Sequence, residues 1–215
     1  MANNYDNKLL ALNYIKKQII TCAMPPGSSI QINEIAEYLN ISKTPVREAL
    51  LELQYDGYVT IIPRKSTIVS KISLQDLKDI YDARTLIECS IINSITKETV
   101  RSNREVLLAL QDKWKNLNIN DQSRENYIAF LQKDLHFHQS IIQLSYNPHL
   151  VRFCQELIYK SQRFWYMALF NNKMDVVQQE HLNILSSILN GNIANAAAYC
   201  QKHISISKAL SILSD

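Results

Sequence analysis

The chain has 215 residues, of which 47% are hydrophobic and 20% charged, so it can form one large or two small domains with a real core and is not intrinsically disordered. The formal net charge of +3 does not by itself indicate nucleic-acid binding, because residues 1–72 carry only eight Lys and Arg against six Asp and Glu. There is no long apolar run typical of a membrane span, and the four cysteines are widely separated, so we expect a cytoplasmic protein without a membrane partner.

Three helices are predicted in the first part of the chain. An amphipathic helix runs from about Tyr5 to Cys22 and is followed by the breaker Pro25-Pro26-Gly27. A short helix then covers Asn33 to Leu39, and the tight turn Asn40-Ile41-Ser42 joins it to the third helix. Two short helices joined in this way predict a helix-turn-helix.

The third helix is the most informative element of the sequence. It begins near Lys43, where the hydroxyl of Ser42 is expected to cap the first turn and Pro45 falls where no intrahelical donor is needed. Apolar residues recur at helical spacing and are expected to be buried: Val46, Ala49, Leu50 and Leu53. Side chains suited to phosphates and base edges lie largely off this stripe: Lys43, Thr44, Arg47 and Gln54.

A β-hairpin is predicted after the third helix. Gly57 offers a stop for the helix, and two short strands follow at Tyr58–Ile62 and Thr67–Val69. The tip between them, Pro63-Arg64-Lys65-Ser66, is basic. A hairpin of this kind next to a helix-turn-helix predicts a wing.

This part of the chain closely resembles the winged helix-turn-helix of the GntR family of bacterial regulators. The resemblance rests on Pro26-Gly27, Ile35-Ala36, Ser42–Leu50 and Gly57–Val59 and covers roughly the first third of the chain. It implies DNA contacts by the following residues: Ser42, Lys43, Thr44, Arg47, Arg64 and Lys65. Arg47 is the first candidate for a bidentate contact to guanine.

Three features depart from the family pattern. Asn33 stands where another polar or basic residue is frequent, Leu51 stands where arginine is common, and the wing tip lacks the usual glycine. These departures leave the operator half-site sequence open, while the DNA-binding prediction itself is unaffected.

The rest of the chain is predicted to be helical, because strand signals almost vanish after the wing. Ser73 with Asp76 resembles a capping box that opens a helix to about Lys97. Asn147-Pro148 indicates a helix start, and Gly191-Asn192 indicates a stop followed by a new cap. Further helices are expected at Arg104–Leu117, Arg124–Leu144, His149–Phe170, Asp175–Leu189 and Ile193–Leu213.

The predicted fold class is therefore mainly α. An N-terminal winged helix-turn-helix, residues 1–72, precedes an all-helical antiparallel bundle, residues 73–215. The boundary is expected near Ser70 to Ser73, in a short link that couples the two parts.

A second group of residues has the spacing of metal ligands. Asp134 and His138 are four residues apart on one predicted helix and therefore share a face, whereas His136 points elsewhere. His181 and His203 lie in the last two predicted helices, which a bundle can bring to the same cavity. Three imidazoles and one carboxylate suit zinc, and also nickel, cobalt or manganese. On spacing alone, each histidine is more often a surface residue or a satisfied core residue.

The helical region resembles the FCD effector domain of the FadR-type branch of GntR regulators. The resemblance rests on Asp134–Ile141, Asn147–Leu150, Glu180-His181 and Ala197–Ile204. It implies a divalent metal site, with zinc as the first candidate, and all four family positions are filled here: Asp134, His138, His181 and His203.

Arg84 and Glu88 match the Arg-x-x-x-Glu pattern of the same domain. This match implies that Arg84 binds an effector carboxylate. A surface ion pair, or a pair at the domain interface, remains an alternative. Aromatic and basic residues that would complete a pocket, or simply belong to the core, are Tyr127, Arg163, Trp165 and Tyr166.

These features predict a ligand-responsive DNA-binding transcriptional regulator, with repression favoured, and not an enzyme. The helical domain would bind a metal ion and a small organic acid, and would form a homodimer that reads a pseudo-palindromic double-stranded DNA operator. One alternative is a metal-dependent hydrolase, since the same ligands can activate water, although the sequence shows no additional general base beside them. Another is a constitutive DNA-binding protein with a purely structural C-terminal domain.

Overall fold

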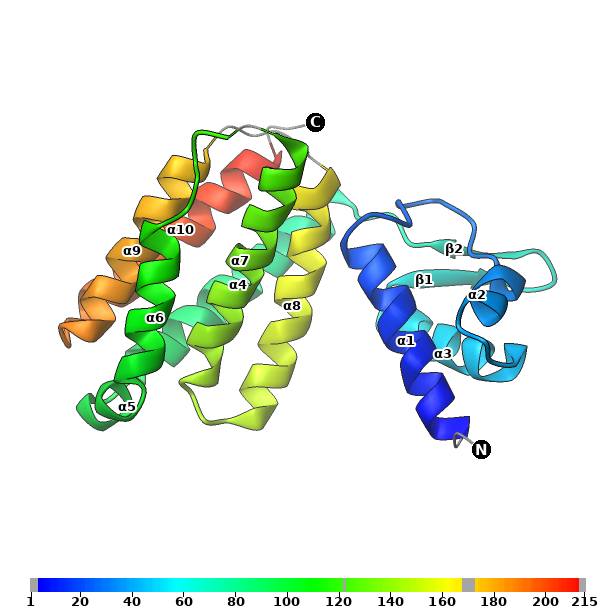
Figure 1. Cartoon of the computed structure of the whole chain (residues 1–215), viewed down its shortest axis with the longest axis horizontal. Helices are drawn as coiled ribbons and strands as arrows, with labels where there is room; N and C mark the ends of the chain where they lie inside the picture. The colour runs from blue at the N-terminus through cyan, green and yellow to red at the C-terminus, as the bar shows by residue number, and fades with distance from the viewer. Residues whose placement is uncertain (1–3, 122, 168–172, 213–215) are drawn as a thin grey trace. The chain divides into compact units, whose positions relative to one another are not determined.

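The computed structural model describes residues 4–121, 123–167 and 173–212. The chain divides into two compact units, Met1–Ser73 and Leu74–Asp215, which Figure 1 draws together and which are described separately below. The division follows Ser73. Among the described residues, no helix is both long and apolar enough to cross a membrane.

The first unit consists of three helices and a hairpin. The elements are α1 (Asn4–Ile20), α2 (Ile32–Tyr38), α3 (Lys43–Tyr55), β1 (Val59–Ile62) and β2 (Ser66–Val69). The strands are antiparallel, with Val59 opposite Val69 and Ile62 opposite Ser66. Ser29 forms an isolated bridge with Ile68, so the segment after α1 pairs with β2 as well. The winged helix-turn-helix prediction is confirmed.

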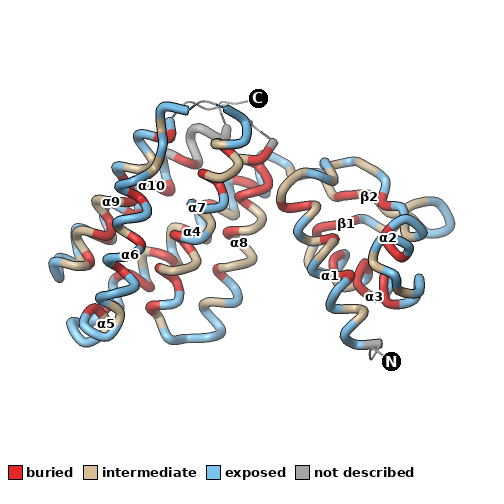
Figure 2. Tube along the Cα trace, viewed as in Figure 1, coloured by how far each residue is buried: buried red, intermediate tan, exposed pale blue. Residues whose placement is uncertain are grey.

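The core of the first unit is formed where α1 and α3 pack on each other. The apolar stripe predicted for α3 is buried in full, together with Pro45. Figure 2 shows the buried side of the helices facing inward. The matching residues of α1 recur every four positions and are fully buried: Ala11, Ile15 and Ile19. Because burying one large aliphatic side chain such as Ile15 or Ile19 contributes about 1.5–3 kcal/mol, this stripe fixes which face of α3 remains exposed.

Two local predictions in this unit need correction. Ser42 does occupy the N-cap position of α3, but its hydroxyl makes no capping hydrogen bond. Helix α1 ends at Ile20, two residues before Cys22, because Cys22 adopts a left-handed backbone conformation with φ of 54°. The hydroxyl of Thr21 also donates to the carbonyl of Lys17, which accompanies this helix end.

The wing tip is a tight turn that places a cation at its apex. The backbone N–H of Lys65 donates to the carbonyl of Ile62 at 3.1 Å, with Pro63 in the second position of the turn. Arg64 follows with φ of 59°, a conformation that glycine adopts without strain and other residues adopt at a cost of about 1–2 kcal/mol. A tight turn therefore forms here without the usual glycine, and Arg64 occupies the position with positive φ.

The end of α3 provides a first test of the backbone geometry. Gly57 follows the helix with φ of 80°, and an added Cβ there would meet no heavy atom within 4 Å. Gly57→Ala should therefore destabilise the first unit by about 1–2 kcal/mol through backbone strain alone. Thermal unfolding followed by circular dichroism measures this loss. Gly57→Asn is the control and should cost less, since asparagine tolerates the left-handed conformation; equal losses for both variants would contradict the backbone explanation.

The second unit is a helical bundle, as predicted. Its helices are α4 (Leu74–Asn93), α5 (Lys97–Ser102), α6 (Arg104–Lys115), α7 (Arg124–Gln143), α8 (Pro148–Met167), α9 (Met174–Leu189) and α10 (Ile193–Ile212). Helix α4 packs against α10, α8 and α7, while α7 packs on α8 and α6 packs on α9. Helices α4, α7, α9 and α10 therefore all belong to one bundle, as Figure 1 shows.

The helix ends in this unit mostly follow the sequence signals. The side chain of Asn147 accepts hydrogen bonds from the backbone N–H groups of His149 and Leu150, at 3.1 and 3.3 Å, as expected for a cap before Pro148. Helix α4, however, ends at Asn93 rather than near Lys97. The reason is a capping box between Thr96 and Thr99 at the start of the short helix α5, which was not predicted from the sequence. The expected ends at Phe170 and Leu213 lie outside the described residues.

Candidate metal centre

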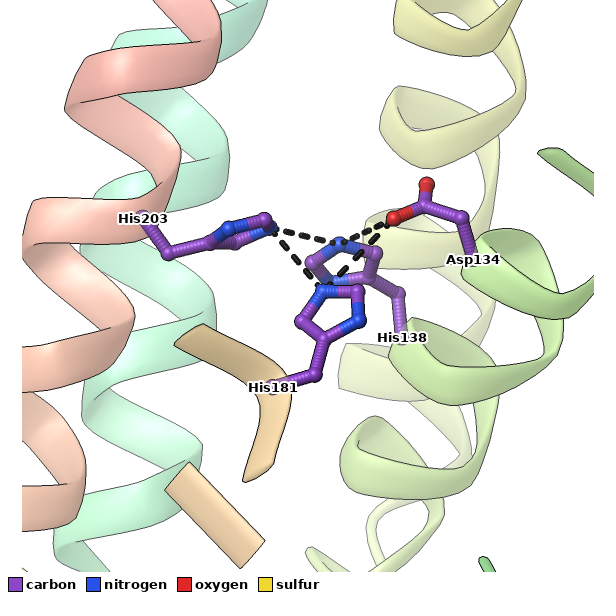
Figure 3. Close-up of side chains that lie close together, drawn as sticks. All are labelled: Asp134, His138, His181 and His203. Carbon is purple, nitrogen blue, oxygen red and sulfur yellow. Dashed lines mark hydrogen bonds and ion pairs between the residues drawn. The ribbon is translucent and has the colours of Figure 1, made fainter. Parts of the chain in front are cut away.

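Three helices of the bundle bring the four expected ligands together. Asp134 and His138 project from neighbouring turns of α7, while His181 comes from α9 and His203 from α10 (Figure 3). Their ligand atoms all lie within 4.8 Å of one another. The three imidazoles are buried and Asp134 is partly buried, whereas His136 is exposed.

The distances within this cluster are those expected around one small cation. Nε2 of His203 lies 3.2 Å from Nε2 of His181 and 3.3 Å from Nε2 of His138. Oδ1 of Asp134 lies 3.6 Å from the Nε2 atom of His181 and 3.8 Å from that of His138. Ligands about 2.0–2.1 Å from a tetrahedral zinc ion are separated by about 3.3–3.4 Å. The separations of the His203 Nε2 atom from the other two imidazole nitrogens therefore match such a site, and the Asp134 carboxylate oxygen stands slightly farther out.

Two buried glutamates orient two of the imidazoles. Oε2 of Glu88 lies 2.7 Å from Nδ1 of His138, and Oε2 of Glu180 lies 2.8 Å from Nδ1 of His203. A carboxylate accepts a hydrogen bond from a protonated Nδ1, which leaves a lone pair on Nε2. The two Nε2 atoms face each other at 3.3 Å. With this tautomer assignment the two lone pairs would repel each other, and a shared cation removes the repulsion, so the residues fit a bound metal ion.

His181 is held by aromatic rings rather than by a carboxylate. Its ring stacks on Phe137, with ring centroids 3.7 Å apart, and meets Trp114 edge to face at 4.2 Å. Its Nδ1 atom is buried without a hydrogen-bond partner among the described residues. Burial, and then the neighbouring His203 and His138, hold the pKa of His181 well below its ordinary value. The imidazole is therefore neutral, which is the form that binds a metal.

This depressed pKa predicts how the metal-free protein responds to acid. The unfolded chain takes up a proton on His181 near pH 6.5, whereas the folded chain does so only at lower pH, so stability is present above about pH 6.5 and is lost as the pH falls below it. Thermal unfolding in a chelator, from about pH 8 to about pH 5.5, should show this decline. His181→Phe should show a shallower decline, and an equally steep one in that variant would contradict the assignment to His181.

Arg84 lies beside the centre in the interior of the bundle. Its Nε donates to Oε1 of Glu88 at 2.8 Å and its Nη1 donates to Oγ of Ser161 at 2.9 Å. Only 5% of Arg84 and none of Glu88 is exposed, so the alternative of a surface ion pair is wrong. Burial by itself raises the pKa of Glu88, but the Arg84 guanidinium, followed by His138, lowers it to about 2. Both partners are therefore charged, and Nη2 of Arg84 has no partner among the described residues.

A small cavity adjoins the cluster. Arg84, Asp134, His138 and His203 contribute to its lining, and it leaves about 40 Å³ for the centres of water-sized molecules. Since about 10–15 Å³ is enough for one water, the cavity can hold a few waters or a compact ligand. Tyr127 and Trp165 belong to the lining as well, whereas Arg163 and Tyr166 do not.

Several lining residues were not expected from the sequence. They are apolar, cationic or hydroxyl side chains from α7, the region before and within α9, and α10: Phe130, Leu131, Lys173, Met174, Val177 and Ser207. Single apolar residues at helical spacing are typical of any bundle core, so only the packing of the helices distinguishes those that face a cavity. Glu180 belongs to the FCD resemblance but was given no role of its own, although its place next to His181 in the sequence was an available signal.

The expected DNA-contacting residues fall in two exposed groups of the first unit. Ser42, Lys43, Thr44 and Arg47 are exposed along the beginning of α3, on the side opposite the buried stripe. Arg64 and Lys65 are exposed at the wing tip. Leu51, which departs from the family pattern, is 60% exposed on α3.

Comparisons with known proteins match both units. Residues 11–69 match the family model described as bacterial regulatory proteins, gntR family, and residues 79–205 match that of the FCD domain. An HTH-type transcriptional regulator from the TAR-I ttuE-ttuC' intergenic region of Agrobacterium vitis is 30% identical over 132 residues, or 61% of this chain and 77% of that protein.

Two Escherichia coli proteins extend the match over more of the chain. The HTH-type transcriptional repressor RspR of strain K12 is 24% identical over 179 residues, covering 81% of this chain and 75% of RspR. The solved structure of E. coli McbR/YncC superposes with a TM-score of 0.76 at 20% identity and covers 99% of both chains. At that identity, the structural likeness establishes the shared fold.

Proposed function

Because the chain belongs to the GntR family of bacterial regulatory proteins and carries an FCD domain, we propose that it is a repressor whose hold on DNA responds to a divalent metal ion and a small organic acid. That it is a DNA-binding transcriptional regulator and not an enzyme follows from the family itself. The finer proposal adds repression, the metal, the class of effector and a homodimer.

The observation that carries the proposal is the buried group of three imidazoles and one carboxylate beside a cavity lined by Arg84. Asp134, His138, His181 and His203 would hold the ion, and zinc is the first candidate for this donor set. A bound cation would supply positive charge to an acid in the cavity. The guanidinium of Arg84 adds a second attraction for a carboxylate, because its Nη2 atom donates no hydrogen bond to any described residue.

The exposed side of α3 supports a reading role in the major groove. Arg47 would contact base edges, the residues at the helix start would contact phosphates, and the cations of the wing tip would lie against the backbone or the minor groove. A two-fold homodimer would match these contacts to a pseudo-palindromic operator in the cytoplasm. Repression is favoured because a relative that covers most of the chain, RspR, is described as a repressor.

An effector controls such a protein only if it binds one arrangement of the DNA-binding units more tightly than the other. The proposal therefore requires that metal or acid in the helical unit changes operator affinity. A constitutive DNA-binding protein with a structural C-terminal unit would need no such site, and a buried cluster of polar side chains is costly in a unit that serves only for packing.

The test uses purified full-length protein and an operator selected from genomic DNA fragments. Metal content is measured by mass spectrometry, and operator affinity is measured by fluorescence anisotropy at one fixed salt concentration, with metal, with chelator, and with metal plus candidate acids. We expect stoichiometric metal and at least about a 5-fold change in operator affinity between ligand states. If the purified protein contains no metal and its operator affinity is the same in every ligand state, the result supports the constitutive alternative instead.

A further inference from the structure

We propose that Glu88 is a positioning residue shared by the metal site and the anion site, in which one carboxylate oxygen holds His138 and the other holds Arg84. This inference rests on the proposed function and assigns a role to a residue that is neither a metal ligand nor an effector contact. It also predicts that metal binding and anion binding depend on a common group.

The contacts of Glu88 are directed to the two sites separately. Oε2 lies 2.7 Å from Nδ1 of His138, whose Nε2 faces the other ligands, and Oε1 accepts from Nε of Arg84 at 2.8 Å. The three residues are 0%, 2% and 5% exposed in the order Glu88, His138 and Arg84. Water therefore has little access to replace a lost contact, and each N–H would be left unsatisfied without the carboxylate.

The contacts of Arg84 leave one part of its guanidinium for a ligand. Glu88 binds Nε and Ser161 binds Nη1, while Nη2 is buried without a hydrogen-bond partner among the described residues, and the guanidinium carbon lies 5.6 Å from the centroid of the Tyr81 ring. Arg84 also lines the cavity next to Asp134 and His138. Glu88 thus fixes the guanidinium plane from one side, and the group it fixes can bind an anion on the other.

Glu180 provides a matched control within the same centre. Its Oε2 lies 2.8 Å from Nδ1 of His203, which is nearly the same contact that Glu88 makes with His138. Among the described residues, however, no arginine contacts Glu180. Both glutamates should therefore support metal binding, and Glu88 alone should support anion binding.

The main experiment compares Glu88→Asp with Glu180→Asp in the full chain. Each substitution keeps the charge but withdraws the carboxylate by one methylene, so that it cannot keep the same contacts. Cobalt(II) affinity and its absorption spectrum report the metal site. Acetate, small enough for the cavity and a weak chelator, is then titrated by calorimetry into cobalt-saturated protein.

We expect both variants to lose at least about 10-fold in cobalt affinity, as is usual when a group that orients a ligand is changed. Glu88→Asp should also lose at least about 10-fold in acetate affinity, whereas Glu180→Asp should retain the wild-type value. If the two variants bind acetate equally, the shared role of Glu88 is wrong. If instead the wild-type protein binds no cobalt, both the proposed function and the shared role of Glu88 are wrong.

A second measurement keeps the inference testable if Glu88→Asp does not fold. In Glu88→Gln the amide has a single oxygen acceptor, which Arg84 and the N–H of His138 must share. If Arg84 keeps that oxygen, the amide NH₂ faces Nδ1 of His138 and favours the tautomer with its proton on Nε2, which cannot bind metal. Adding Arg84→Met should therefore restore part of the cobalt affinity, and a double variant no tighter than Glu88→Gln would overturn the shared role.

Discussion

His203→Ala should abolish stable metal binding, with a loss of more than about 100-fold in affinity. This bound follows because changing a group that merely orients a ligand already costs about 10–100-fold, and His203 stands among the ligands themselves, with its Nε2 at 3.2 and 3.3 Å from two other imidazole nitrogens. The substitution also leaves the buried carboxylate of Glu180 without its imidazole. Zinc content after dialysis and competition with a chromophoric chelator measure the loss.

Thermal unfolding gives an independent measure of the same loss. A ligand present at about 100 times its dissociation constant stabilises the folded state by about 2.7 kcal/mol, which corresponds to a rise of about 5–10 °C in the unfolding midpoint of a domain of this size. Wild-type protein should show this rise on addition of zinc, and His203→Ala should not. His136→Ala is the matched control, because His136 is exposed on α7 outside the cluster. Full metal occupancy in His203→Ala would show that His203 is not a ligand.

Arg47→Ala should weaken binding to the selected operator by about 1–3 kcal/mol, or roughly 5- to 150-fold, while metal content stays unchanged. The reason is that Arg47 is exposed on α3, a helix whose opposite face is fixed by the buried residues Val46, Ala49, Leu50 and Leu53. The guanidinium is therefore exposed to solvent, where a DNA groove would meet it, and is not part of the core. Fluorescence anisotropy at one salt concentration measures the change.

Two variants separate base recognition from general charge in that experiment. Arg47→Lys keeps the charge but loses the planar fork, so it should lose much of the specific affinity and little of the non-specific affinity. Arg101→Ala removes another exposed arginine, from α5 in the helical unit, where no DNA contact is expected, and should change specific affinity little. Unaltered operator affinity in Arg47→Ala would remove Arg47 from the set of base-reading residues.

The winged helix-turn-helix was predictable because its signals are local. The spacing of the apolar residues on α3, Gly57 after the helix and the basic hairpin tip each depend on residues within one or two turns of one another. Local signals also gave Pro148 as a helix start and Gly191 as a stop. They were wrong at α5, because one helix was predicted to continue to about Lys97, whereas α4 ends at Asn93 and a capping box between Thr96 and Thr99 begins a new helix.

For the site, the sequence indicated the ligand types and the pairing of Asp134 with His138, because residues four apart share a helix face. Their approach to His181 and His203, and the burial of Arg84, depended on the packing of α4, α7, α9 and α10. The roles open to Glu88 and Glu180 arise only from that packing, since each contacts a histidine from another helix. The sequence by itself determined which residues each helix presents, because helix periodicity is a local property. Only the tertiary structure decided which of those faces meet, because helix packing joins residues that the chain keeps far apart.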